Sequence, residues 1–255
     1  MTGPVQSIER AAAILRLLAG GPRRLGLGEV AASLGLAKGT AHGILRTLQH
    51  VDFVEQDAAT GKYQLGAALL HLGTSYLDVN ELRSRSINWA DALAARSGEA
   101  VRLGTPLEGK VLIVHHVFRP DDTLQTLDVG TLLPLHASSL GKVLLAYGTA
   151  PVEAALDSGL EMYTRHTVIA PERLTEALAE VREQGWAVEV QEMSMGEAGV
   201  ASPIRGQGGL VVGALGLSGP VERICDSHGR PRPNLITLLR EAARAISRDL
   251  GAARW

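Results

Sequence analysis

The chain has 255 residues, of which 45% are hydrophobic and 20% charged, so it can bury a core and is not typical of a disordered protein. A single cysteine, Cys225, excludes an internal disulfide and any cysteine-rich zinc module. The absence of a secretory signal and of an apolar run of about 18 residues predicts a soluble cytoplasmic protein with no membrane partner.

The formal net charge of −2 gives no indication of a nucleic-acid partner, but the charge is unevenly distributed. Residues 1–66 hold seven Lys or Arg and five Asp or Glu, net +2, whereas the remainder holds 18 and 22, net −4. Many DNA-binding domains are more basic than this N-terminal part. If it binds DNA, we expect the affinity to come from two or more copies acting together.

Three helices are predicted within the first 48 residues. Ser7 is a suitable N-cap for the first, which ends near Gly20. Residues 27–48 predict two short amphipathic helices that meet at Gly35, where a left-handed backbone allows a sharp turn. This arrangement is a helix-turn-helix. The apolar stripe of its second helix has the spacing i, i+3, i+4, i+7 at Ala41, Ile44, Leu45 and Leu48.

The opposite face of that second helix has residue types suited to DNA. Small residues allow a close approach to the DNA backbone, while Lys, Arg, Thr and His donate hydrogen bonds to phosphates and base edges. A helix-turn-helix also occurs as plain packing in helical proteins, so the segment that follows has to support the interpretation. The candidate DNA-binding residues are Lys38, Gly39, Thr40, His42, Gly43 and Arg46.

Two short strands, near 53–56 and 62–65, are predicted to flank a turn at 57–61. Three helices followed by such a hairpin make a winged helix, in which Lys62 at the hairpin tip can contact the DNA backbone. A hairpin with a lysine at its tip is often only a solvated turn. Here its position directly after the helix-turn-helix is the argument for DNA binding.

A linker helix is predicted over 67–80, between a DNA-binding domain at 1–66 and a second domain at 81–255. Its apolar residues recur at helical spacing, which makes it a candidate dimer surface, although packing on its own wing is equally possible. These residues are Leu69, Leu72, Gly73, Tyr76 and Leu77.

The second domain is predicted to be an antiparallel α+β domain built around one sheet, not a parallel βαβ array. Glu108-Gly109 is a predicted hairpin turn, and 206–209 joins the last two strands. Predicted strands lie at 100–103, 111–118, 124–129, 186–191, 199–204 and 210–217, and predicted helices at 87–94, 138–142 onward, 151–156, 171–184 and 234–250.

Catalysis, a metal and a cofactor are not predicted, because no nucleophile elbow, Walker A loop or H-E-x-x-H motif is present. His115 and His116 are adjacent in a strand and point to opposite faces, so they cannot both bind one metal; one of them is expected in the interior. Cys225 has no neighbouring base and is interpreted as an unreactive thiol.

A ligand site is better supported at 138–141, where an extended segment passes into a helix. Backbone amides at a helix N-terminus attract anions or polar oxygens. Ordinary capping by Ser138 or Ser139 explains the same residues equally well.

With these elements together, the whole chain resembles the IclR family of bacterial transcription regulators. The matching segments are SIERAAAILRLLA, LGEVAASLGLAKGTAHGILRTL, FVEQDAATGKYQLG, LPLHASSLGKVLLA, GWAVEVQEMSMGEAGVASPI and VGALGLSGP. Within the family, LGLAKGTAHGILRTLQ, SYLDVNELR and VLIVHHVFRPDD look most like the glycerol operon regulators.

The resemblance implies a GAF-like effector domain, dimers that pair through the DNA-binding regions, and tetramers formed as dimers of dimers. It also implies an effector pocket on the concave side of the sheet. Some members have polar side chains where this chain has Gly199 and Gly216, and many have Arg at Gly43. The pocket residues that it implies are Ser139, Leu140, Glu189, Gly199, Gly216 and Ser218.

The expected function is a repressor that leaves a palindromic operator when glycerol or glycerol 3-phosphate binds. Helix-start amides suit a phosphate, whereas Glu189 repels it and accepts hydrogen bonds from hydroxyls, so the two ligands stay open. The alternatives are an activator that answers to a small carboxylate, or a ligand-sensing, enzyme-like module whose winged helix mediates protein contacts.

Overall fold

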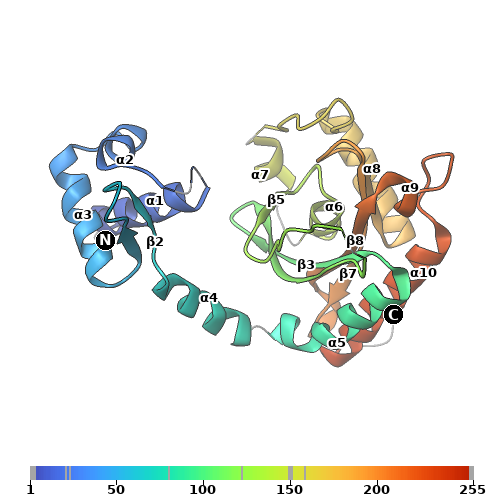
Figure 1. The fold of residues 1–255 in the computed structure, drawn as a ribbon. Coiled ribbons are helices and arrows are strands. Elements are labelled where there is room, and N and C mark those ends of the chain that lie inside the picture. The colour runs from blue at the N-terminus through green and yellow to red at the C-terminus, as the bar shows by residue number, and fades with distance from the viewer. Residues whose placement is uncertain are drawn as a thin grey trace. The chain divides into compact units, whose positions relative to one another are not determined.

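The computed structural model describes residues 4–20, 22, 24–79, 81–121, 123–148, 152–157 and 159–252. The chain divides into two compact units, residues 1–79 and 80–255 (Figure 1). Within the described ranges, no helix is both long enough and apolar enough to span a bilayer.

The first unit is a three-helix core followed by a hairpin, which confirms the predicted winged helix-turn-helix. Ala41, Leu45 and Leu48 are buried, as the apolar stripe predicted, and Gly35 has the left-handed φ of +61°. The elements are α1 (Gln6–Gly20), α2 (Leu27–Ser33), α3 (Lys38–His50), β1 (Val54–Gln56), β2 (Tyr63–Leu65) and α4 (Ala68–Val79).

The wing is an antiparallel pair in which Val54 lies opposite Leu65. Leu25 forms a bridge to Tyr63, so the segment before α2 is fixed to the same hairpin. Asp57 closes the turn, because its carboxylate accepts hydrogen bonds from the amide and the hydroxyl of Thr60 at 2.8 and 2.7 Å.

Within the segment 67–80, predicted as a linker helix, the structure has the helix α4. Leu70 and Leu72 are exposed on it. The side chains of Tyr76 and Leu77, and all of Asn80, lie outside the described residues.

The second unit is the predicted antiparallel α+β domain, with six strands in the order β5-β4-β3-β8-β7-β6. Helices α5 and α10 pack together on one face of the sheet, and α6 lies on the other face with α8 behind it (Figure 1). The elements are α5 (Glu81–Ser97), β3 (Ala100–Leu107), β4 (Lys110–Val117), β5 (Leu132–Pro134), α6 (Ser139–Ala146), α7 (Val152–Asp157), α8 (Pro171–Gln184), β6 (Ala187–Val190), β7 (Glu197–Arg205), the 3-10 turn η1 (Gln207–Gly209), β8 (Val211–Pro220), α9 (Val221–Ile224) and α10 (Pro233–Asp249).

The predicted hairpin turns are confirmed. Glu108 and Gly109 have φ of +48° and +72°, as a tight turn between antiparallel strands requires. Between β7 and β8, Gly208 and Gly209 both have φ of +81°. The glycine-rich segment at 206–209 is therefore a turn and not a phosphate-binding loop.

The strand predicted at 124–129 is wrong. Leu124 and Leu127 are exposed there, and the backbone amide of Asp128 donates to His116 Nδ1 at 3.1 Å instead of joining a ladder. The edge strand is β5, which pairs with 110–112 of β4 and lies just beyond the predicted segment. The helix α9 was also not predicted, because four residues are too few to show a helical period.

Candidate DNA-binding surface and effector pocket

The candidate DNA-binding residues of α3 lie together on the face turned away from the core of the first unit. Burial of Ala41, Leu45 and Leu48 fixes the orientation of the helix and therefore exposes the opposite side. The side chain of Thr40 is half-buried. The exposed members of the set are Lys38, Gly39, His42, Gly43 and Arg46.

Two glycines leave the backbone of α3 uncovered in this face. A Cβ atom added at Gly39 or Gly43 would have no neighbour within 4 Å. Since both positions are helical and face solvent, nothing in the fold of the first unit requires glycine there. The smooth surface that they leave is bordered by the donors of Lys38, His42 and Arg46.

Lys62 does not lie at the tip of the wing, which is formed by 57–61, but directly before β2. Its Nζ is 3.6 Å from the carboxylate of Glu29 on α2, in a pair that is largely open to solvent. Glu29 also accepts a hydrogen bond from the Gly26 amide at 2.6 Å, which is the main reason that its pKa is lowered; the Lys62 charge adds to this effect. The charge of Lys62 is therefore partly compensated.

The six candidate effector residues come from four separate segments and line one cavity in the second unit. Strand register explains the convergence, because Glu189 on β6 pairs with Gly199 on β7, and Gly199 pairs with Ser218 on β8. The start of α6 adds Ser139 and Leu140. This inner cavity has a volume of about 20 Å³, which is enough for roughly one water molecule.

Glycines form the floor of the inner cavity. A Cβ at Gly199 would lie 3.0 Å from Ser139 Oγ and 3.4 Å from Glu189 Oε1. A Cβ at Gly216 would lie 3.1 Å from Leu140 Cδ2. Any side chain at these positions would therefore reduce the space between α6 and the sheet.

The start of α6 is capped by Ser138 and not by Ser139. Ser138 Oγ accepts a hydrogen bond from the Gly141 amide at 3.1 Å and donates one to the Pro134 carbonyl at 2.6 Å. The Lys142 amide donates the first intrahelical bond, to the Ser138 carbonyl, at 3.0 Å. The amides of Ser139 and Leu140 precede that bond, so the helix geometry gives them no intrahelical acceptor.

Glu189 is the one acidic side chain of the inner cavity, and it is 8% exposed. Burial raises its pKa to about 7; the nearby Glu192 charge adds to the rise, while the Glu192 amide, which donates to Glu189 at 3.1 Å, and the Lys142 charge oppose it. Lys142 forms a buried ion pair with Glu192 and donates to the Val188 carbonyl at 3.2 Å. The cavity therefore has a carboxyl that is only partly ionised at neutral pH.

Two protein-family models match the chain: the IclR helix-turn-helix domain over residues 7–58, and the bacterial transcriptional regulator IclR C-terminal domain over residues 74–248. The chain belongs to the IclR family. It is therefore a DNA-binding transcriptional regulator and not an enzyme.

Within the IclR family, the chain is 54% identical to the glycerol operon regulatory protein of Streptomyces coelicolor and 52% identical to that of Streptomyces griseus. Both similarities cover 100% of this chain and of the relative. A solved structure of an IclR transcriptional regulator from Alicyclobacillus acidocaldarius has a TM-score of 0.83 at 29% identity, and the match covers 96% of this chain and 99% of that one.

A polar cluster beside the inner cavity of this IclR-family regulator was not predicted from the sequence. Arg102 Nε donates to Asp128 Oδ2 at 2.7 Å, and the Asp128 amide donates to His116 Nδ1. An arginine within the buried apolar strand 100–103 was a sequence feature that could have indicated it. His116 lines a groove of about 350 Å³ next to the inner cavity, while His115 faces the other way, near Arg83.

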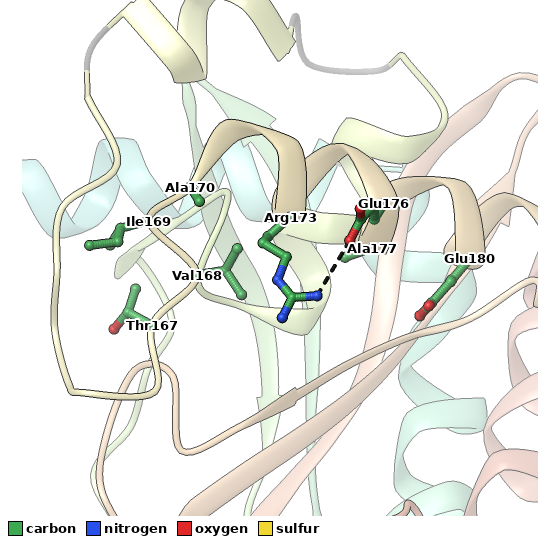
Figure 2. Close-up of a pocket in the computed structure, with 8 residues that line it drawn as sticks. All are labelled: Thr167, Val168, Ile169, Ala170, Arg173, Glu176, Ala177 and Glu180. Atoms are coloured by element: carbon green, nitrogen blue, oxygen red, sulfur yellow. Dashed lines mark ion pairs between the residues drawn. The ribbon is translucent and has the colours of Figure 1, made fainter.

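A larger cavity, of about 490 Å³, lies on the outer side of α8 and has none of the candidate effector residues. Figure 2 shows Arg173 and Glu176 side by side on α8, joined by an ion pair of 3.5 Å between well-exposed side chains. Its charged side chains are exposed, and Thr167 is its one buried polar lining residue, so it has no buried carboxyl like that of the inner cavity. Among the described residues, no cluster of three metal-binding side chains occurs in this IclR-family chain.

Proposed function

We propose that this IclR-family regulator represses a glycerol or related carbon catabolic operon and leaves its operator when glycerol or glycerol 3-phosphate binds. The observation that supports this most is the similarity to glycerol operon regulatory proteins over the full length of both chains. It acts in the cytoplasm as a dimer or tetramer. Residues 1–66 bind operator DNA, 81–255 bind the effector, and 67–80 connect the two domains.

The α3 face supports the DNA-binding part of the proposal. Arg46 and Lys38 supply cationic donors, His42 and Thr40 supply further hydrogen-bond donors, and the glycines leave the helix backbone open to close approach. Lys62 adds a contact to the DNA backbone beside the groove.

The inner cavity supports the effector-binding part. It combines the Ser139 and Ser218 hydroxyls with a buried carboxyl at Glu189, which are partners for ligand hydroxyls. A ligand releases the operator only if it binds the low-affinity arrangement of the protein more tightly than the high-affinity one.

Operator release can be measured by fluorescence anisotropy of DNA from the region upstream of this protein's own operon, at fixed salt. Glycerol or glycerol 3-phosphate is expected to weaken binding of the full-length chain. Tighter binding would instead support an activator, and unchanged binding with both compounds would contradict the proposed effector.

Substitution of Glu189→Ala is expected to abolish the response to ligand without weakening DNA binding, because it removes the acceptor from the cavity. Glu180→Ala is the matched control, since Glu180 is an exposed carboxylate on the outer side of α8 (Figure 2). A normal response in Glu189→Ala would place the effector elsewhere.

A further inference from the structure

The groove beside the inner cavity has a cationic side chain in a defined position. Arg102 on β3 pairs in register with His116 on β4 and with Gly216 on β8. Paired residues project from the same face of a sheet, so Arg102 stands between a histidine and a position without a side chain. Arg102 therefore borders the space above Gly216, and it lines both the inner cavity and the groove.

The guanidinium of Arg102 keeps donors available for a ligand. Only its Nε is engaged, by Asp128 at 2.7 Å; its two Nη groups have no acceptor among the residues that the structure describes. The side chain is 31% exposed. A guanidinium presents its donors in a planar fork that fits a carboxylate or a phosphate.

His116 provides a second donor next to Arg102. Its Nδ1 accepts the hydrogen bond from the Asp128 amide, so in the neutral ring the hydrogen is on Nε2. Burial lowers the pKa of His116, which favours the neutral ring. The side chain is 9% exposed, and its Nε2 is buried with no partner among the described residues.

Glu189, the hydrogen-bond acceptor of the site, lies several strands away from Arg102 in the sheet. Glu189 is on β6, and β3 with Arg102 is three strands away in the order β3-β8-β7-β6, or roughly 14 Å between strand axes. The inner cavity alone, at about 20 Å³, holds roughly one water molecule. An effector must therefore extend into the groove, where the charged groups that join Glu189 are Arg102, Asp128, the exposed Glu197 and Arg119, which is paired with Asp121.

We infer that the effector is a short hydroxylated carbon chain with an acidic group, a phosphate or a carboxylate, and that Arg102 together with His116 binds the acidic group while Ser139 and Glu189 bind the hydroxyls. This inference rests on the proposed effector site and specifies its ligand class. The partly neutral state of Glu189 lowers its repulsion of an anion at the far end of the cavity. The opposing carboxylate, Asp128, occupies only one edge of Arg102.

Isothermal titration calorimetry on the full-length chain tests this inference with glycerol, sn-glycerol 3-phosphate and D-glycerate. At least one acidic compound is expected to bind about tenfold or more tightly than glycerol. Arg102→Gln should remove that preference and leave glycerol affinity within about twofold, and Arg102→Lys should retain part of it because the charge remains. Arg173→Gln, which removes an exposed guanidinium on α8, is the matched control and should change nothing.

The acid-binding role of Arg102 is overturned if neither acidic compound binds the unaltered chain, or if glycerol binds it equally well. It is also overturned if Arg102→Gln weakens the affinity for glycerol as much as the affinity for the acidic compounds. Retained glycerol affinity also shows that the variant is folded. Operator release, measured separately by anisotropy, distinguishes the two proposals. Acidic ligand bound through Arg102 without operator release contradicts only the repressor mechanism, whereas operator release by glycerol with no acidic preference contradicts only the role of Arg102.

Discussion

Glu189 is a buried carboxyl whose surroundings oppose its ionisation. It has lost most of its contact with water and lies near the charge of Glu192, while the amides of Glu192 and Met193 and the Lys142 charge favour its ionised form. Its pKa in the folded chain is therefore about 7, against an ordinary value of 4.5. A group of this kind is retained at a cost in stability, which is typical of binding sites.

Glu189→Gln is expected to raise the free energy of unfolding at pH 8 by about 1–3 kcal/mol. Below pH 4.5 the carboxyl is mostly protonated in both the folded and the unfolded chain, so its ionisation does not lower the free energy of unfolding there. Between 4.5 and about 7 the unfolded chain ionises first, and the folded state loses stability relative to it. Denaturant unfolding at pH 4.5 and pH 8 should show a gain for the variant only at the higher pH.

The matched change Glu192→Gln should have the opposite effect. Glu192 forms the buried ion pair with Lys142, and its removal leaves a buried ammonium without a charged partner. If Glu192→Gln lowers the free energy of unfolding at pH 8 and Glu189→Gln raises it, the two carboxyls have opposite effects on stability. Equal losses in both variants would mean that Glu189 is ionised and stabilised in the folded chain.

Arg46 has the longest side chain among the hydrogen-bond donors on the exposed face of α3. If it reads a base edge, Arg46→Ala is expected to cost about 1–3 kcal/mol of specific operator binding. Arg16→Ala removes the same charge from the exposed side of α1 and is the control for a general electrostatic effect. Equal operator affinity of the Arg46→Ala variant and the unaltered chain at fixed salt would exclude Arg46 from the interface.

At the scale of elements, α3 illustrates what the sequence could predict. Its apolar spacing at Ala41, Leu45 and Leu48 is a local pattern, and burial of that stripe fixes which residues face outward. Local patterns of this kind also located the hairpin turn at Glu108-Gly109. In each case, side chains a few residues apart determine the structure.

The polar cluster at Arg102 could not be predicted in the same way. Its partner Asp128 lies 26 residues away, on a segment whose sequence predicted a strand. That segment has exposed leucines and uses its backbone to hold His116, while the short β5 that follows it pairs at the sheet edge. Which distant side chain reaches Arg102 depends on the path of this loop, and no local period indicates it.

The open glycines of α3 lead to a prediction about the helix as a unit. Glycine within a helix costs about 0.5–1 kcal/mol relative to alanine, and a Cβ at Gly43 meets no atom of the fold. Gly43→Ala should therefore raise the stability of the chain and weaken operator binding, because the methyl group occupies the surface that approaches DNA. Thermal unfolding and anisotropy measure the two effects. A more stable variant with unchanged operator affinity would show that this surface does not touch DNA.

At the scale of the whole molecule, charge limits what one copy of the chain can do. Residues 1–66 have a net charge of +2 and the rest of the chain −4. Within the DNA-binding unit, Lys62 is partly compensated by Glu29, and Arg24 is paired with Asp57 at 2.7 Å. Few cations are left to neutralise phosphates, and phosphate neutralisation supplies much of the affinity of any DNA-binding protein.

Paired half-sites should therefore bind far more tightly than a single one. When two winged helices belong to one assembly, binding of the second becomes intramolecular, and the gain in affinity is expected to be about 100-fold or more. The plot of log K against log salt concentration should also be about twice as steep for a full palindrome as for a half-site duplex, because twice as many phosphates are neutralised. Anisotropy titrations with the two duplexes at several salt concentrations measure both quantities. Equal affinity and equal slope would mean that one copy is sufficient, and that the operator is read by contacts other than the modest set of cations on α3 and the wing.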